Sequence, residues 1–449
     1  MHMNNWRKRA CDVLTGLRVL AGDRRGAVAI IFVIALVPLV AAGGAAIDIS
    51  RAYLVKQRLG YAIDAAGLAV GSSSGTEAEL NAIMLRFFQA NYPAGEVGVP
   101  ATPSMTIVDG VVTITADAEV NTTLMRIVGV DNITVSARVE VVRETKGLEV
   151  VLVLDNTGSM AGTKITSLKT AATDFTNILF GKDTVSTNLK IGIVPFAGTV
   201  NIGTSRESPY TKGPGAASYS PTTWGGCVEA RNGVVPTDQE DTWVNNTAHQ
   251  WRRYLWPTHS SRNNWPPVTS TRGPNKQCPV AVLPLTNVKS EVTSKITAMV
   301  AAGVTHINLG AVWGWRVLSP GEPFTEGRAY GDPDYNKAII IMTDGENFIS
   351  DVTGDYSAYG ALSQGRLGTT SQSAAITELN NRLLTVCTGM KALDIIVYTI
   401  TFQSTPAAFA VMRSCATDAG KAFESPTNAD LESTFRAIGA QLSNLRLGR

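Results

Sequence analysis

The sequence is poor in histidine and lacks several local motifs on which common enzyme active sites are built. Only four of its 449 residues are histidine, and none forms the His-Glu-x-x-His pair of zinc peptidases. No glycine-rich loop ends in Gly-Lys-Ser or Gly-Lys-Thr, and Ser159 does not lie in a Gly-x-Ser-x-Gly elbow. The pattern favours a binding protein, and we expect no enzyme.

The sequence also has almost no net charge. Its 39 basic and 37 acidic residues leave a formal charge of +2. Such a balance provides no extended positive field that would attract a polyanion, so we expect no nucleic-acid partner. Charged residues make up only 17% of the chain, which indicates a large buried core together with a membrane-embedded segment.

Cysteine is scarce as well, and its spacing is wrong for a Cys-x-x-Cys zinc or redox motif. Cys11 stands alone near the start, whereas Cys227, Cys278, Cys387 and Cys415 follow much later. An even number of late cysteines indicates disulfides in an oxidising compartment. We prefer pairing the first two, which share one long insertion, and the last two, which flank adjacent elements. The other pairings and free thiols remain open.

One uncharged apolar run, residues 26–47, is long enough to cross a bilayer core of ~30 Å as a helix. Six basic residues precede it and only three follow closely. Because basic flanks stay in the cytoplasm, we expect residues 1–25 to be cytoplasmic and the chain to pass the bacterial inner membrane once. The rest would be periplasmic or surface-exposed. A cleaved signal peptide is the alternative, since residues 41–46 are small.

A small region follows the apolar run. The helical pattern continues to about residue 70, and a second, amphipathic helix is expected over 77–90. Residues 104–143 then alternate apolar and polar side chains, with a turn at Asp109-Gly110, as antiparallel strands do. We therefore predict a pilin-like helix plus a small β region over residues 48–147. It either packs against like domains or serves as a spacer.

From residue 148 onward, apolar strands alternate with helices. This alternation is typical of an α/β fold with a mostly parallel sheet covered by helices on both faces. We predict one such domain over residues 148–449, with an insertion at about 202–282. The expected strands are 148–154, 189–195, 338–342, 395–401 and 421–424, and the expected helices are 165–180, 288–302, 308–318, 374–392, 407–418 and 429–445.

The insertion is rich in tryptophan as well as in proline, glycine and small polar residues. Loops of this length inside a compact domain are usually functional or mobile. Its aromatic residues are either exposed anchors of an interface or the core of the insertion itself. The tryptophans concerned are Trp224, Trp243, Trp251, Trp256 and Trp265.

Oxygen-bearing side chains follow two of the expected strands where each ends. The first strand delivers Asp155, Thr157 and Ser159 to one turn, and the strand 338–342 ends close to Asp344. Ligands of open α/β sheets bind at the carboxyl ends of the strands, and hard cations prefer carboxylate and hydroxyl oxygens. The sequence therefore predicts a divalent-cation site at this edge. The alternative is that the carboxylates are turn residues or helix caps.

The spacing Asp155-x-Thr157-x-Ser159 resembles the metal-ion-dependent adhesion site of von Willebrand factor A domains, which is usually Asp-x-Ser-x-Ser. In that family a further loop donates a third hydroxyl, and Thr305 stands at the matching place. Asp344 matches the second carboxylate of the family. The resemblance implies a Rossmann-like von Willebrand A domain. It also implies a bound divalent cation, with Mg²⁺ expected before Mn²⁺ or Ca²⁺, and an open coordination position that an acidic side chain of a protein partner fills.

The start of the chain carries a second resemblance. An arginine pair, Gly26, the apolar span and the segment Ile47-Asp48-Ile-Ser-Arg51-Ala-Tyr53 resemble the amino-terminal segment of TadE/TadG-type proteins of tight-adherence (Flp) pilus assembly. TadG-like members carry a von Willebrand A domain behind such an anchor. The resemblance implies a pilus-assembly role in the bacterial envelope and other pilus-assembly proteins as partners.

Together these features predict a membrane-anchored, metal-dependent binding component of Flp pilus assembly. Two alternatives remain. The first is a structural anchor of an envelope complex that holds no metal. The second is a hydrolase that uses the same cation to activate water, for which only His306 or Glu346 could serve as the base.

Overall fold

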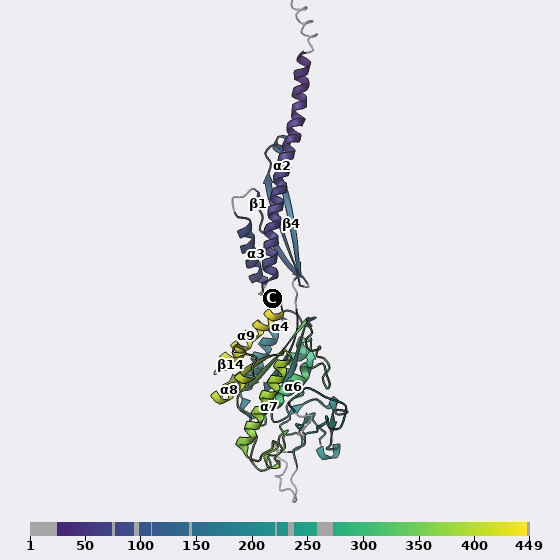
Figure 1. The fold of residues 1–449 in the computed structure, drawn as a ribbon, viewed down its shortest axis with the longest axis vertical. Coiled ribbons are helices and arrows are strands. Elements are labelled where there is room, and N and C mark those ends of the chain that lie inside the picture. The colour runs from purple at the N-terminus through teal and green to yellow at the C-terminus, as the bar shows by residue number, and fades with distance from the viewer. Residues whose placement is uncertain are drawn as a thin grey trace, which may run out of the picture. The chain divides into compact units, whose positions relative to one another are not determined.

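A computed structural model shows two compact units, residues 1–144 and 145–448, which we call the amino-terminal unit and the α/β unit (Figure 1). Each unit has its own hydrophobic core. The structure describes residues 25–73, 77–93, 98–108, 110–142, 146–220, 222–231, 238–257 and 273–446.

The amino-terminal unit begins with one continuous helix of 47 residues, α2 (Arg25–Gly71). At ~1.5 Å per residue this helix is roughly 70 Å long, more than twice the thickness of a bilayer core. Its segment Ile30–Gly71 is long and apolar enough to cross a membrane. The predicted helix through residues 26–47 and its continuation to about residue 70 are therefore confirmed as a single element, with Pro38 inside it.

A second helix and an antiparallel sheet pack on the later part of α2. The predicted helix over 77–90 is α3 (Glu77–Asn91). The strands are β1 (Val99–Pro100), β2 (Ser104–Val108), β3 (Val111–Asn121) and β4 (Asn132–Val142), with β4 along one edge of β3 and β1 and β2 along the other. The predicted antiparallel strands are thus confirmed, while Asp109 of the predicted turn lies outside the described residues.

Alternation along the strands builds the core of this unit. In β3, Val112, Ile114 and Ala116 are buried while the residues between them are partly exposed. They pack against one stripe of α2 and one stripe of α3 at helical spacing. The buried helix side chains include Val55, Leu59, Ile63, Leu80, Met84 and Phe88.

The α/β unit is built on a sheet with the strand order β14-β13-β12-β5-β6-β7-β9, and β11 also pairs with β6. The first five strands run parallel, whereas β7, β9 and β11 join antiparallel. The mostly parallel sheet is therefore confirmed. The strands are β5 (Gly147–Asp155), β6 (Leu189–Phe196), β7 (Val200–Asn201), β9 (Cys227–Val228), β11 (Leu283–Thr286), β12 (Tyr335–Thr343), β13 (Ile396–Phe402) and β14 (Ala422–Ser425).

Helices cover both faces of this sheet, as predicted. Alternate residues of β5 face opposite ways: Leu152 joins one buried cluster and Val153 joins the other. The first cluster lies under α4 (Thr163–Phe180), α5 (Lys289–Ala298) and α9 (Asn428–Arg446). The second lies under α6 (Ile307–Leu318), α7 (Gln372–Ala392) and α8 (Pro406–Cys415).

Two helices end earlier than predicted. Helix α5 stops at Ala298 rather than residue 302 because Met299 turns extended and the Ala302 amide donates to the carbonyl of Asn156 at 2.7 Å. A contact across the sheet edge thus replaces a further helical turn. Helix α8 stops at Cys415 rather than residue 418, since Ala416 is extended and the Thr417 amide donates to Val397.

Both preferred disulfides are confirmed. Cys227 is bonded to Cys278 with a Cα separation of 5.8 Å, and Cys387 is bonded to Cys415 with a Cα separation of 5.2 Å. The first bond closes the insertion on itself. The second ties α7 to the end of α8.

Three tryptophans of the insertion are packed inward. Trp224, Trp251 and Trp256 are all at most 6% exposed. Trp251 stacks at a tilt on Trp313 of α6, with ring centroids 4.6 Å apart, so the insertion extends the main core. For Trp224, Trp251 and Trp256 the interpretation as exposed interface anchors is therefore wrong, while Trp243 is partly buried against the same core. Trp265 lies outside the described residues.

Candidate functional site

The site begins where β5 ends. Asp155 is fully buried, and one of its carboxylate oxygens, Oδ1, accepts a hydrogen bond from the Thr157 amide at 2.7 Å. The other, Oδ2, accepts from the Thr343 hydroxyl at 2.8 Å. Thr343 is the last residue of β12, the neighbouring parallel strand. The site thus lies at the carboxyl ends of two adjacent parallel strands, which is where open α/β sheets bind ligands.

A chain of side-chain contacts then connects the two predicted segments. The Thr157 hydroxyl lies 3.0 Å from that of Ser159, and the Ser159 hydroxyl donates to Asp344 Oδ1 at 2.6 Å. The structure therefore brings Asp155, Thr157, Ser159 and Asp344 together. This placement was predicted from the ends of the strands.

Thr305 is the fifth predicted residue. Backbone hydrogen bonds connect its segment, residues 303–305, to the loop after β5 and to the loop after β12. The Gly158 amide donates to the carbonyl of Gly303 at 2.9 Å, and the Phe348 amide donates to the carbonyl of Thr305 at 2.8 Å. Gly303 has φ of 93°, a conformation that favours glycine, and lies close to Gln277. Thr305 is 7% exposed and lies directly before His306, the N-cap residue of α6.

Lys164 also belongs to this site, although it was not predicted from the sequence. Its ammonium donates to Asp344 Oδ2 at 2.7 Å, and its side chain is 23% exposed. It lies in the first turn of α4, where the helix dipole disfavours a cation. A lysine in the first turn of a helix directly behind the Asp-x-Thr-x-Ser motif was the available signal that an anion lay nearby.

Asp155 is a buried acid whose pKa is strongly perturbed. Burial, followed by the nearby Asp344 carboxylate, raises the pKa of Asp155 to about 6, although its hydrogen bonds with Thr157 and Thr343 act in the opposite direction. Its partners in the part of the chain that the structure describes are an amide and a hydroxyl, and no lysine, arginine or histidine is paired with it. Within the described segments, therefore, no cationic side chain neutralises its charge.

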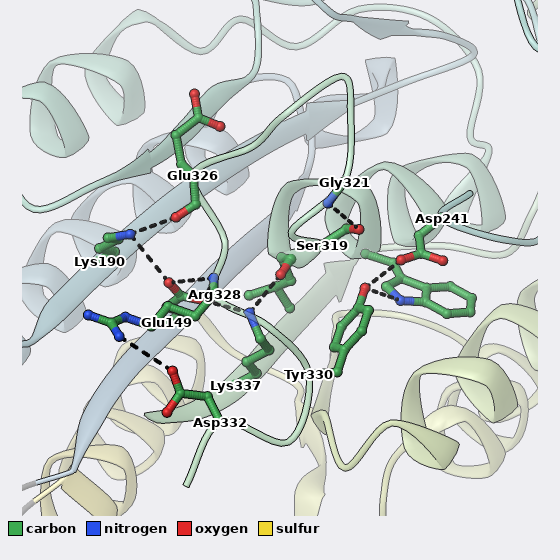
Figure 2. Close-up of polar contacts among 12 residues, drawn as sticks. Glu149, Lys190, Asp241, Ser319, Gly321, Glu326, Arg328, Tyr330, Asp332 and Lys337 are labelled. Atoms are coloured by element: carbon green, nitrogen blue, oxygen red, sulfur yellow. Dashed lines mark hydrogen bonds and ion pairs between the residues drawn. The ribbon is translucent and has the colours of Figure 1, made fainter. Parts of the chain in front are cut away.

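Other buried carboxylates of the α/β unit do have cationic partners. Figure 2 shows Glu149, near the start of β5, surrounded by Lys337 at 2.6 Å, Lys190 at 3.5 Å and the Arg328 amide. Glu149 is fully buried, like Asp155. The charge of Glu149, near the amino end of β5, is therefore compensated by cationic and hydrogen-bonding partners.

The insertion holds a further neutralised carboxylate. Asp238 is fully buried and accepts hydrogen bonds from Arg231 at 3.1 Å and Arg316 at 2.8 Å. These cations keep the pKa of Asp238 lowered even though burial acts to raise it. Among these three buried acids, the one without a protein cation is Asp155.

The donor set at the site fits a hard divalent cation. It offers two carboxylates and several hydroxyls, which are the oxygen ligands that Mg²⁺, Mn²⁺ and Ca²⁺ accept. Across the described residues, no three His, Cys, Asp or Glu side chains gather as a metal cluster. A cation at this site would therefore depend on the hydroxyls of Thr157, Ser159 and Thr305 as well as on the carboxylates.

His306 and Glu346 are the two residues that the hydrolase alternative would need as a base, and each has its own contacts. His306 is fully buried, packs edge-on against Tyr359, and has its pKa lowered to about 4, chiefly by burial. The carboxylate of Glu346 accepts a hydrogen bond from Thr405 at 2.6 Å.

A family comparison bears on the amino-terminal unit. Residues 26–73 match the family Putative Flp pilus-assembly TadE/G-like. This match confirms the TadE/TadG resemblance for that segment, which covers the apolar run and the rest of α2. No curated protein matches the chain in sequence.

Solved structures similar to this chain include pilus proteins. The vWF domain of the type V pili tip protein Mfa5 from Porphyromonas gingivalis matches with 12% identity and a TM-score of 0.37, covering 68% of this chain and 97% of that one. The pilus adhesin SpaC from Lactobacillus rhamnosus GG matches with 10% identity and a TM-score of 0.37, covering 76% of this chain and 34% of that one.

A mussel protein matches as well. Proximal thread matrix protein 1 from the mussel byssus, with a zinc-occupied MIDAS motif, has 9% identity and a TM-score of 0.34, covering 67% of this chain and 46% of that one.

Proposed function

We propose that this chain is a membrane-anchored component of Flp pilus assembly whose α/β unit binds a divalent cation and, through it, an acidic group of a protein partner. The TadE/G-like match over residues 26–73 supports the pilus-assembly role. The apolar part of α2 supports single-pass anchoring in the inner membrane, with the α/β unit on the periplasmic side or at the surface.

The observation that carries the cation proposal is the state of Asp155. A buried carboxylate without a protein cation is costly, and a bound divalent ion would remove that cost. Asp155 has no such protein partner among the described residues, while Glu149 and Asp238 have theirs. The sequence resemblance to the adhesion site of von Willebrand A domains points to the same residues.

In this proposal the carboxylates and the hydroxyls of the site have different roles. Asp155 and Asp344 supply charge, directly or through water, and Thr157, Ser159 and Thr305 supply hydroxyl oxygens. The cation, when bound, offers a positive centre that a carboxylate can reach. The protein surface around it would then select the partner, so the role is binding and not catalysis.

Calorimetry of the full chain in detergent, titrated with Mg²⁺, Mn²⁺ and Ca²⁺, tests the cation site. We expect saturable binding that Asp155→Ala abolishes. Asp351→Asn is the matched control, because Asp351 is an exposed acid in the loop that follows Asp344. Binding that survives in Asp155→Ala, or is lost equally in Asp351→Asn, would remove Asp155 from the site.

A metal-free structural anchor is the second candidate, and the Lys164–Asp344 pair favours it. This ammonium already supplies positive charge to one carboxylate. The two candidates differ in the effect of Thr305→Ala in a complemented deletion strain. The cation proposal expects lowered adhesion or pilus assembly with normal membrane insertion, and chelation should have the same effect. The structural anchor expects wild-type behaviour from this variant.

A further inference from the structure

A second surface of interest lies in the amino-terminal unit, on the loop between β3 and β4. This loop, residues 122–131, contains the short helix η1 (Met125–Val128). Ile127 is 70% exposed and Val128 is 54% exposed. Together with the exposed aliphatic side chains of α2 beside them, they form a contiguous apolar surface of the kind that marks a protein or membrane contact.

The loop is fixed to α2 by a buried carboxylate. Asp48 is 1% exposed and accepts hydrogen bonds from the amides of Thr123, Leu124 and Met125 at 3.0, 2.9 and 2.8 Å. Arg51, one turn further along α2, donates to the Thr123 hydroxyl at 2.7 Å. The position of the loop along the helix is therefore well determined.

Close packing brings the loop onto the helix surface. A Cβ atom at Gly44 would lie 2.4 Å from Cβ of Leu124, so only glycine permits this approach. An apolar pocket of about 180 Å³ opens beside the contact. It is lined by Leu36, Val37, Val40 and Ala41 of α2 and by Leu124, Ile127 and Val128 of the loop.

The helix side of this pocket belongs to the apolar run 26–47. Ala41 lies about 9 Å before Ile47 along the helix axis, at ~1.5 Å per residue. If the run spans the bilayer, the apolar side chains of the loop reach a similar depth below its outer end. Interfacial apolar segments insert by ~5–10 Å, to the boundary between headgroups and acyl chains.

We propose that residues 124–128 form a lipid-contacting loop that inserts into the outer face of the membrane beside α2, with acyl chains in the apolar pocket. Continuity with the apolar run selects lipid as the occupant. Arg126 lies within the loop with its side chain 73% exposed and pairs with the equally exposed Asp131 at 3.2 Å, so an anionic headgroup would compete with Asp131 for it. The inserted loop would fix the height and tilt of the amino-terminal unit on the membrane.

The proposal rests on the proposed membrane span and is independent of the cation site. Its test uses the full chain with Cys11→Ser, reconstituted into vesicles of phosphatidylethanolamine and phosphatidylglycerol. Nitroxide labels are placed singly at Ile127→Cys and Val128→Cys. Val37→Cys reports on the span. Val142→Cys is the matched control, an aliphatic residue 72% exposed at the opposite end of β4.

Electron paramagnetic resonance then measures collisions of each label with oxygen, which dissolves in the bilayer, and with a water-soluble nickel chelate. We expect the labels at positions 127 and 128 to favour oxygen, as the label at 37 does, and the label at 142 to favour the chelate. If positions 127 and 128 behave like 142 while 37 favours oxygen, the loop proposal is wrong and the span stands.

Two other outcomes also decide the matter. If the label at position 37 favours the chelate, the span fails and the loop proposal fails with it. If positions 127 and 128 are shielded from both reagents, a protein surface such as a second copy of the chain covers the loop, and lipid contact is overturned.

Discussion

Strand β5 carries a fully buried carboxylate near each end, and the two have opposite surroundings. Glu149 meets two lysine ammonium groups and a backbone amide, as Figure 2 shows. Asp155 meets an amide and a hydroxyl, and its pKa is raised by burial and then by a nearby second carboxylate. Among the residues with a described structure, the same strand thus has one end, at Glu149, whose charge is balanced by cations and one end, at Asp155, whose charge is not.

The difference separates a structural acid from a binding acid. A buried ion pair such as that of Glu149 holds strands and loops together. Its charges already compensate each other, so they do not attract a cationic ligand. A buried carboxylate that lacks a cationic partner destabilises the ligand-free protein. A cation that binds to this carboxylate therefore stabilises the folded protein. The contrast between the two ends of β5 predicts four effects of decreasing size.

The largest effect concerns the balanced end. Glu149→Gln should lower the free energy of unfolding of the α/β unit by about 3–5 kcal/mol, because it removes the carboxylate paired with the buried Lys337, which keeps the neutral Leu318 carbonyl as a partner. Urea unfolding with and without Mg²⁺ measures this. The loss should be the same in both conditions. A loss that Mg²⁺ restores would mean that the two ends are not distinct.

The next effect concerns how the stability of the protein depends on pH through Asp155, whose charge is unbalanced. The pKa of Asp155 is raised from 3.8 to about 6 in the folded protein. Such a group makes stability fall as pH rises from about 4 to 6, and the full cost, ~3 kcal/mol at most, persists at higher pH. With a chelator at pH 7.5, Asp155→Asn should therefore be more stable than the wild type.

Below pH 4 that advantage of Asp155→Asn should disappear, because Asp155 is then protonated in both folded and unfolded chains. Thermal melts across this pH range provide the measurement. An Asp155→Asn variant that is less stable than the wild type at pH 7.5 under chelation would contradict the unbalanced charge.

The third effect is stabilisation by the ion. At a hundredfold excess over Kd, a cation should stabilise the protein by ~2.7 kcal/mol. Asp155→Ala and Asp344→Ala should abolish this gain, and Ser159→Ala should reduce it. Thermal shift with Mg²⁺ or Mn²⁺ measures each variant against its own chelated sample. An unchanged shift in both aspartate variants would exclude these ligands.

The smallest effect concerns Lys164. Its ammonium is 23% exposed and pairs with Asp344, whose side chain is fully buried, so we expect the pair to be worth about 1 kcal/mol. If ammonium and cation compete for Asp344, Lys164→Met should tighten cation binding about fivefold. Lys169→Met, on the same helix, is the control. Weaker binding in Lys164→Met would show that Lys164 supports the site instead of competing with the ion.

Much of the fold could be predicted because its elements have regular periods. Near-continuous apolar runs predicted β5 and β12, and strict alternation predicted β3 and β4. The elements that were mispredicted are those that tertiary contacts decide. Helix α5 ends at Ala298, and the chain after it donates the Ala302 amide to the carbonyl of Asn156. No local pattern encodes that contact.

The candidate site divides in the same way. Asp155, Thr157, Ser159 and Asp344 were predictable, because the ends of parallel strands meet at one edge of the sheet. Lys164 and the hydroxyl of Thr343 were not predicted. The place of Lys164 in the first turn of α4 indicates a nearby anion, but no local pattern tells which carboxylate it contacts or where the Thr343 hydroxyl points. The buried partners of Glu149 come from distant segments, so the contrast between the two ends of β5 appears only in the folded chain.

The most direct test is to locate the ion. Crystals of the protein soaked with Mn²⁺ and measured at the manganese absorption edge should show an anomalous peak beside Asp155 and Asp344. No peak is expected beside Glu149. A peak within the Glu149 network, or a structure in which Lys164 still holds Asp344 at saturating Mn²⁺ with no peak near Asp155, would contradict the account.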